Sequence, residues 1–142
     1  MCENTLSSIN DVQLITIQSL SDGRGSMTVV SETMIPFVIK RVFSITSNSS
    51  VRGNHAHRNC NQFIACLTGS LTVFVTDGKN EKTYTMDHSG QGLLIPPGIW
   101  SSQQYDENLT TINVYCDLDY DEADYLRDYD EYIKYRSQFK IK

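Results

Sequence analysis

The feature that most constrains the fold is a series of short apolar segments separated by turn-forming residues, from residue 12 to about residue 116. Glycine, proline and aspartate mark the turns, because they adopt the backbone angles that tight turns need. The turn signals are Asp22-Gly23, Gly69, Asp77-Gly78 and Pro96-Pro97-Gly98. The expected strands are 12–17, 27–31, 37–45, 62–67, 71–76, 84–86, 93–95 and 111–116, with a further strand that carries His55 and His57. This spacing predicts a β-sandwich or barrel.

Beyond residue 116 the chain becomes rich in Asp, Glu and Tyr. Between 121 and 138, apolar residues recur at spacings of three and four, which places them on one face of a helix. These residues are Ala123, Leu126, Tyr129 and Ile133. We therefore expect one domain over residues 1–142, with a barrel over about 12–116 and an α-helix over about 121–138. The tyrosines of this segment should pack the helix onto the barrel; the alternative is that one or two of them line a ligand site or a subunit interface.

Composition and charge exclude several classes of function. A net charge of −5 without a cluster of Lys or Arg argues against a nucleic-acid partner. No apolar run approaches the ~20 residues of a membrane span, and the N-terminus lacks the pattern of a signal peptide. The four cysteines show no paired spacing. Together these features predict a cytoplasmic protein with reduced thiols.

Two of the three histidines, His55 and His57, stand one residue apart in an expected strand. Alternate residues of a strand point to the same side, so the two imidazoles should lie together. Metal binding and acid–base catalysis are the usual roles of such a pair. The alternative is two histidines on the surface of an edge strand.

Three arginines are candidates for binding an anion. Arg41 lies on an otherwise apolar face of segment 37–45, Arg24 is flanked by glycines, and Arg52 directly precedes the histidine strand. Guanidinium groups match phosphate oxygens, so three of them near a histidine pair suit a diphosphate. Each arginine taken singly could instead form an ordinary salt bridge.

The histidine segment resembles the first motif of the cupin superfamily, and Gly90 to Ser101 resembles the second. The resemblance implies a double-stranded β-helix, the jelly-roll barrel of cupins. The motif spacing is kept, but Gln62 and Ser101 stand where cupins carry a Glu and a His as metal ligands. An amide and a hydroxyl are poor ligands for a transition metal. We therefore expect no metal and no cofactor, and acid–base catalysis by the histidines themselves.

Nearly the whole chain resembles the nucleotide-sugar 3,4-ketoisomerases of the FdtA/QdtA (WxcM-like) type. The segments that carry the resemblance are Asp22 to Ser26, Ile35 to Phe37, Lys40 to Val42, Arg52 to His57, Cys66 to Ser70, Ile95 to Trp100 and the acidic tail Tyr120 to Asp130. It implies conversion of dTDP-4-keto-6-deoxyglucose to a dTDP-3-keto-6-deoxyhexose, for the amino-deoxysugars of surface glycans such as lipopolysaccharide.

Carried over by motif position, the resemblance makes His55 the base and His57 its partner. Gln62 and Ser101 would then face the sugar, and Arg24, Arg41 and Arg52 the diphosphate. Many relatives carry Tyr just after the Arg-Val of the third strand, whereas this chain has Phe43-Ser44 there. The tyrosine proton donor therefore cannot be transferred to that position.

Two alternatives to this activity are a dTDP-sugar 3,5-epimerase and a non-catalytic sugar-binding cupin. The epimerases favour Gln at the position of His57, and binding alone needs no pair of titrating groups. We also expect a homodimer, because small cupins have open sheet edges that a strand such as 12–17 can cover across subunits.

Overall fold

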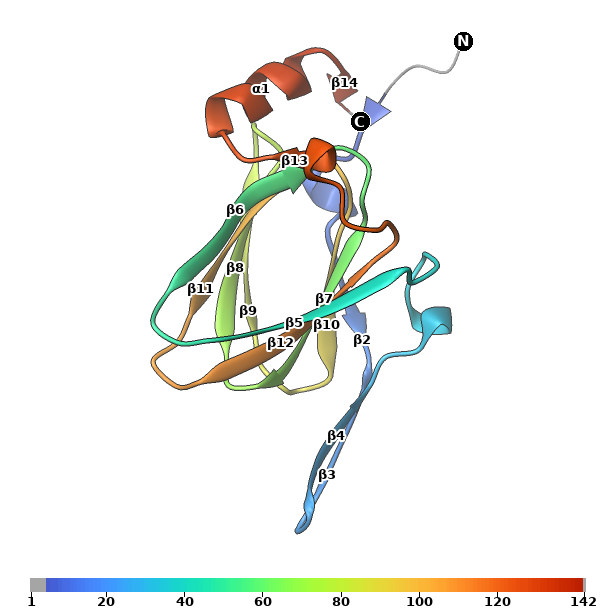
Figure 1. Cartoon of the computed structure of the whole chain (residues 1–142), viewed down its shortest axis with the longest axis vertical. Helices are drawn as coiled ribbons and strands as arrows, with labels where there is room; N and C mark the ends of the chain where they lie inside the picture. Colours follow the sequence, from blue (N-terminus) through green and yellow to red (C-terminus); the bar gives the residue numbers. More distant parts are fainter. Residues whose placement is uncertain (1–4, 142) are drawn as a thin grey trace.

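The computed structural model describes residues 5–141 and consists mainly of two five-stranded sheets that face each other (Figure 1). The first sheet contains, in spatial order, β2 (Gln13–Thr16), β10 (Gln91–Ile95), β7 (Gln62–Thr68), β12 (Thr110–Cys116) and β5 (Arg41–Ser47). The second contains β13 (Tyr125–Leu126), β6 (Val51–His57), β11 (Trp100–Tyr105), β8 (Leu71–Thr76) and β9 (Glu81–Met86). The neighbouring strands are antiparallel. The expected all-β architecture is confirmed.

Side chains of alternate residues fill the space between the two sheets. Leu71, Val73 and Val75 of β8 point inward and are almost fully buried, and so are Ile112 and Val114 of β12. This alternation is what a strand with one buried face requires. The central strand β7 is buried on both faces, because a second apolar cluster covers its outer side.

The segment 37–45 is not one continuous strand with a single apolar face, as the sequence suggests. Phe37 and Ile39 pack in the outer cluster that covers β7. β5 begins only at Arg41, and from there Phe43 and Ile45 pack against the inner core. The chain therefore crosses from one side of the sheet to the other just before β5, which pattern alone does not reveal.

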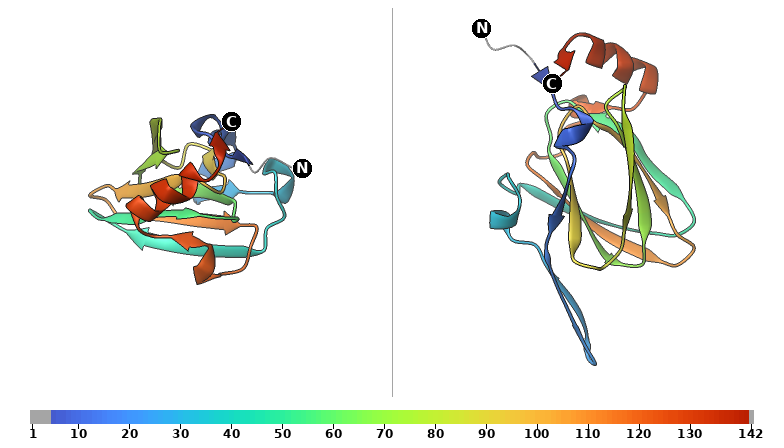
Figure 2. Two further views of the ribbon diagram at one scale, coloured as in Figure 1. Left: turned by 90° about the horizontal axis from the view of Figure 1, so that it is seen from above. Right: turned by 180° about the vertical axis from the view of Figure 1, so that it is seen from behind.

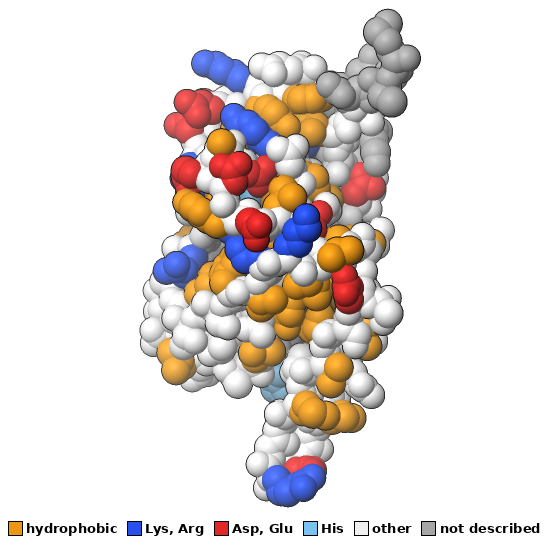
Figure 3. All heavy atoms as spheres, turned by 45° about the vertical axis from the view of Figure 1, so that its right-hand side comes forward, with side chains coloured by type: hydrophobic (Ala, Val, Ile, Leu, Met, Phe, Trp, Pro, Cys, Tyr) orange, Lys and Arg blue, Asp and Glu red, His pale blue; other side chains and the backbone are white. Residues whose placement is uncertain are grey.

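A long hairpin of β3 (Gln18–Asp22) and β4 (Gly25–Val29) projects from the body of the barrel (Figures 1 and 2). The expected strand 27–31 corresponds to β4, while β3 was not expected. Leu20 and Met27, which are paired across the hairpin, are both about half exposed. Figure 3 shows hydrophobic side chains exposed along this hairpin, with charged groups at its tip.

The acidic tail differs from the expected single helix over 121–138. A 3₁₀ turn, η3 (Glu122–Asp124), leads into β13, and α1 (Tyr129–Ser137) starts only after Asp128, whose side chain caps the helix by accepting from the Glu131 N–H. Backbone pairing of β13 with β6 replaces the first helical turns.

The buried face of α1 also differs from the expected one. Tyr132 and Arg136 are buried, whereas Tyr129 and Ile133 are 43% and 37% exposed. The Tyr132 hydroxyl and the Arg136 guanidinium both donate to the Gly98 carbonyl, which fixes α1 over one end of the barrel (Figure 1). Polar anchoring thus decides which side of the helix packs.

Three small elements complete the chain: η1 (Ile9–Asp11), η2 (Glu32–Met34) and a parallel pair of β1 (Thr5–Leu6) with β14 (Lys140–Ile141). Cys60, Cys66 and Cys116 are free, buried thiols, and Cys2 lies outside the described residues. Within residues 5–141, no helix has the length and apolar character to cross a membrane.

Candidate active site

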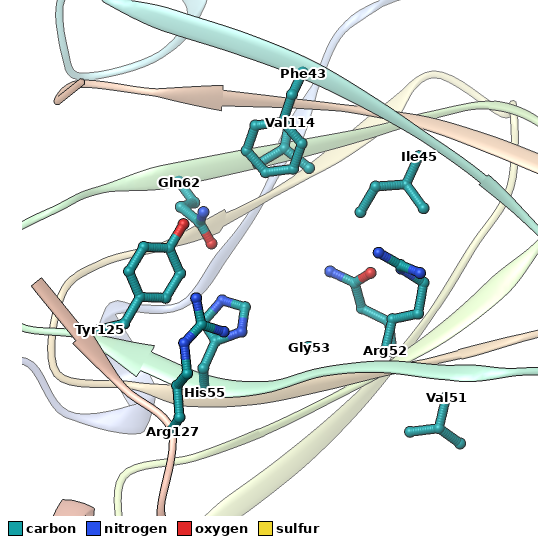
Figure 4. Close-up of a pocket in the computed structure, with 11 residues that line it drawn as sticks. Phe43, Ile45, Val51, Arg52, Gly53, His55, Gln62, Val114, Tyr125 and Arg127 are labelled. Atoms are coloured by element: carbon teal, nitrogen blue, oxygen red, sulfur yellow. The ribbon is translucent and has the colours of Figure 1, made fainter. Parts of the chain in front are cut away.

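A cavity of about 380 Å³ opens between the two sheets, where β5 and β6 diverge. Its apolar wall comes from β5 and β12, with Phe43, Ile45 and Val114, and its polar wall from β6 and the C-terminal segment (Figure 4). The polar side chains that line it are Arg52, His55, Gln62, Gln103, Tyr125 and Arg127. The cavity therefore offers one apolar face and one face that carries titrating and charged groups.

An irregularity in β6 places Arg52 and His55 on the same cavity. Strict alternation would send residues 52 and 55 to opposite faces. The pairing of β6 with β11 shifts register here, from Ser101 opposite His55 to Ser102 opposite Gly53. Gly53 and Asn54 both have positive φ, at 84° and 57°, conformations that Gly and Asn adopt most readily. Because of this bulge, the Arg52 side chain points into the cavity, while His55 and His57 keep the alternation of the strand.

His55 and His57 lie side by side, as the spacing predicts. Their ring centroids are 5.0 Å apart and the rings are nearly perpendicular. His55 lines the cavity, whereas His57 is 5% exposed and lies behind it. The reading of two surface histidines is therefore wrong: one ring faces the cavity and the other supports it.

His57 is held by a buried carboxylate that the sequence did not single out. Its Nδ1 lies 2.8 Å from Oδ2 of Asp124, and Asp124 Oδ1 accepts from the backbone N–H of Asn59. A carboxylate that accepts from Nδ1 leaves Nε2 unprotonated in the neutral ring. That Nε2 is buried and has no hydrogen-bond partner among the described residues. The arrangement is a fixed His–Asp pair directly behind His55.

The surroundings of both imidazoles lower their pKa values and so favour the neutral rings near pH 7. Burial, together with the neighbouring His57, lowers the pKa of His55 to about 4. Burial also lowers the pKa of His57, against the opposing effect of its hydrogen bond to Asp124. A neutral imidazole can accept a proton, so His55 has the protonation state of a general base.

Gln62 is oriented by a thiol at the inner end of the cavity. Its Nε2 donates to Sγ of Cys116 at 3.7 Å, and an Arg41 guanidinium nitrogen donates to the same sulfur at 3.5 Å. A hydrogen bond from Cys60, together with Arg41, lowers the pKa of Cys116 to about 6 despite burial. The amide oxygen of Gln62 is left on the cavity side (Figure 4), where it can accept from a hydroxyl group.

Tyr125 and Arg127 also line the cavity and were not individually predicted as site residues. Tyr125 pairs with His57 in the β13–β6 ladder, and its ring centroid lies 4.3 Å from that of His57 and 5.3 Å from that of His55. The Arg127 guanidinium lies over the Tyr125 ring at 4.2 Å and forms a salt bridge with Glu122. The sequence offered two signals here: the acidic tail, which periodicity assigned to a helix, and the alternative that one or two of its tyrosines line a ligand site.

The other predicted residues are placed as follows. Ser101 is buried and lies opposite His55 in the ladder. Neither Ser101 nor Arg41 is among the residues that line the cavity, but the Arg41 guanidinium lies 5.5 Å from the ring centroid of Phe43, which does line it. Arg24 lies at the tip of the β3–β4 hairpin, is 92% exposed and is paired with Asp22. Within one chain, the three arginines therefore do not converge, because the hairpin carries Arg24 away from the barrel.

One group of side chains could hold a metal ion within the described ranges. His57, Cys60 and Asp124 offer ligand atoms within 4.8 Å of one another. His57 and Asp124 are, however, hydrogen-bonded to each other, so a metal would have to replace that contact. The cupin ligand positions hold His55, His57, Gln62 and Ser101, a set with only two strong ligands. That no metal is bound remains a prediction.

Comparisons with known proteins identify the family to which this chain belongs. The family described as "FdtA: WxcM-like, C-terminal" matches residues 10–137. The TDP-4-oxo-6-deoxy-alpha-D-glucose-3,4-oxoisomerase of Aneurinibacillus thermoaerophilus is 34% identical over 132 residues, which cover 91% of this chain and 95% of that protein.

Solved structures are similar over the same extent. One is a histidine-to-asparagine mutant of the 3,4-ketoisomerase QdtA from Thermoanaerobacterium thermosaccharolyticum, in complex with TDP-4-keto-6-deoxyglucose. It is 31% identical to this chain, with a TM-score of 0.83, and the match covers 92% of this chain and 96% of that chain. A 3,4-ketoisomerase from Helicobacter canadensis is 28% identical, with a TM-score of 0.81, over 89% and 98%. Two sugar epimerases, at 18% and 16% identity, share the fold alone. The chain belongs to the FdtA, WxcM-like family.

Proposed function

We propose that this protein is a sugar 3,4-ketoisomerase that converts dTDP-4-keto-6-deoxyglucose to a dTDP-3-keto-6-deoxyhexose. The observation that carries the proposal is the neutral His55 at the cavity, backed by the buried pair of His57 and Asp124. The similarity to oxoisomerases and ketoisomerases of TDP-sugars supports the substrate class. Neither a metal nor a cofactor is part of the proposed chemistry.

The reaction moves a ketone from carbon 4 to carbon 3 through an enediol(ate). His55 removes the proton from carbon 3, and the electron pair of that bond forms the double bond between carbons 3 and 4. That proton is then delivered to carbon 4, while the hydroxyl proton of the oxygen on carbon 3 passes to the oxygen on carbon 4, and the oxygen on carbon 3 becomes the new carbonyl. His57 stabilises the resulting imidazolium and enediolate, with Asp124 holding its ring in place.

The substrate is held at its diphosphate by arginines and at its sugar by polar groups of the barrel. Arg52 lines the cavity, and Arg41 lies over Phe43, which belongs to the cavity lining. Gln62, which also lines the cavity, is the proposed partner of a sugar hydroxyl. Arg24 can contribute only from a second chain, since its hairpin points away from its own cavity.

A homodimer is therefore part of the proposal. β2 is an edge strand with an exposed Leu14, and the neighbouring hairpin exposes Leu20 and Met27. Open sheet edges of this kind are covered by pairing in native proteins. The reduced, buried thiols suit a cytoplasmic enzyme that supplies amino-deoxysugars for surface glycans such as lipopolysaccharide.

The direct test is to incubate the protein with dTDP-4-keto-6-deoxyglucose and identify the product by NMR. We expect a 3-keto sugar with the configuration at carbon 5 unchanged. Inversion at carbon 5 would indicate a 3,5-epimerase instead. Tight binding of TDP without any product would indicate a sugar-binding protein, and either result would overturn the proposal.

A further inference from the structure

The Tyr125 hydroxyl is the one hydroxyl among the side chains that line the cavity. Tyr125 comes from β13, and its backbone pairing with His57 fixes the ring against both histidines. Figure 4 shows the phenol reaching into the cavity between Gln62 and His55. A substrate bound against His55 would therefore also meet the Tyr125 oxygen.

Two cations surround this phenol. The Arg127 guanidinium lies over its ring at 4.2 Å, and Arg41 is close enough to interact electrostatically with Tyr125. A phenol can donate a proton to an adjacent oxygen and accept one back. Two neighbouring guanidinium groups balance the negative charge that this exchange places on the phenol oxygen.

The other polar groups of the cavity cannot exchange protons in this way. Gln62 and Gln103 carry amides, which donate and accept hydrogen bonds but do not titrate. Arg52 and Arg127 stay protonated at all relevant pH values. His57 lies behind His55 and is bound to Asp124. Within the cavity lining, only His55 and Tyr125 can pass protons to a sugar.

The proposed isomerisation needs two kinds of proton movement. One proton moves from carbon 3 to carbon 4, and another moves from the oxygen on carbon 3 to the oxygen on carbon 4. A single base that lies next to carbons 3 and 4 cannot also reach the oxygens on both of these carbons. The chemistry therefore asks for a second acid–base group at the vicinal oxygens, and the cavity contains one candidate.

Resting on the proposed function, we propose that Tyr125 is the acid–base catalyst at the two sugar oxygens. As His55 takes the proton from carbon 3, the phenol gives its proton to the oxygen on carbon 4, which produces an enediol and a phenolate. The phenolate then takes the proton of the oxygen on carbon 3, the carbonyl forms there, and the imidazolium returns its proton to carbon 4. Both catalysts end in their starting forms.

Tyr125→Phe tests this role, because it keeps the ring and its contacts with His57 and Arg127 and removes only the hydroxyl. We expect kcat to fall by about 10² or more, with KM and the Kd for TDP within about threefold of the wild type. Tyr129→Phe is the matched control, since Tyr129 is exposed and lies outside the cavity. It should have wild-type kinetics.

Turnover by Tyr125→Phe within about fivefold of the wild type would overturn the inference, and so would a loss confined to TDP binding. If the variant does not fold, 3-fluorotyrosine at position 125 replaces it; an unchanged kcat and pH profile would then contradict the role. A wild-type protein that forms no 3-keto product is a failure of the proposed function instead. The two failures are thus distinguishable.

Discussion

Two segments far apart in the sequence form the polar wall of the cavity, and they differ in how they reach it. β6 supplies His55 and His57 from a strand inside a barrel sheet. The segment from Asp124 to Arg127 comes after the barrel and adds a carboxylate, a phenol and a guanidinium to the same wall. The strand carries the proposed base, and the tail segment holds and complements it.

The difference shows that a base and its support need not share a local motif. A His-x-His spacing is enough to place two rings on one face of a strand. The contact between His57 and Asp124 instead spans 67 residues and depends on the short β13–β6 ladder. Substitutions that remove one contribution of one segment at a time therefore show which segment contributes more to activity.

The largest effect is expected in β6 itself. His55→Asn keeps the shape of the side chain but cannot accept a proton at neutral pH, so turnover should fall by about 10²–10⁴ while TDP still binds. The turnover of His57→Asn should fall less, because the proposed role of His57 is to stabilise the imidazolium of His55 and the enediolate. Steady-state kinetics and calorimetry with TDP measure both effects.

His88→Asn is the control for these variants, because His88 is exposed and lies outside the cavity. It should retain wild-type turnover. If the turnover of His55→Asn were within tenfold of the wild-type value, the tail segment would contribute more to the chemistry than β6.

The buried histidines should also make stability depend on pH. The pKa of His55 in the folded protein is about 4, below the ordinary histidine value of 6.5, so the unfolded state binds more protons between these values. The free energy of unfolding should therefore decrease by up to about 3 kcal/mol as pH falls from 6.5 to 4. Urea unfolding over this range measures it.

His55→Asn should remove much of this slope, leaving the smaller part that belongs to His57. Were the slope identical in the variant, the low pKa of His55 would not be the cause of the acid sensitivity.

In the tail segment, Asp124→Asn should reduce kcat by about 10- to 100-fold, because it weakens the buried hydrogen bond that orients His57. The control is Asp119→Asn, an exposed acid in the preceding loop. If Asp124→Asn lost as much activity as His55→Asn, the tail would be as important to the chemistry as the strand.

The smallest effects are expected for the arginines. Arg52→Ala should weaken TDP binding by about tenfold, less at high salt, since a charge-assisted hydrogen bond contributes about 1.5–3 kcal/mol. Arg41→Ala should behave alike, with the fold kept. Arg24→Ala should weaken binding only in a dimer, which titration calorimetry combined with sedimentation can establish. Unchanged TDP affinity in all three variants would mean that these arginines do not bind the diphosphate.

The sequence was informative where function depends on local spacing. It placed both histidines and Gln62 at the site, because each lies at a fixed position of a strand. It failed where tertiary contacts decide: Asp128 and the β13 pairing shift the start of α1, and the bulge at Gly53 and Asn54 turns Arg52 into the cavity. Arg24 was placed near the cavity, but its hairpin projects into solvent.

Hydrogen–deuterium exchange at carbon 3 of dTDP-4-keto-6-deoxyglucose tests most directly the claim that His55 is the base. The exchange reports removal of that proton alone, before any product forms. In deuterated water, we expect the wild-type protein to exchange the proton and His55→Asn to lose at least about 10² in rate, with TDP binding retained. Exchange by His55→Asn at the wild-type rate would mean that another residue is the base.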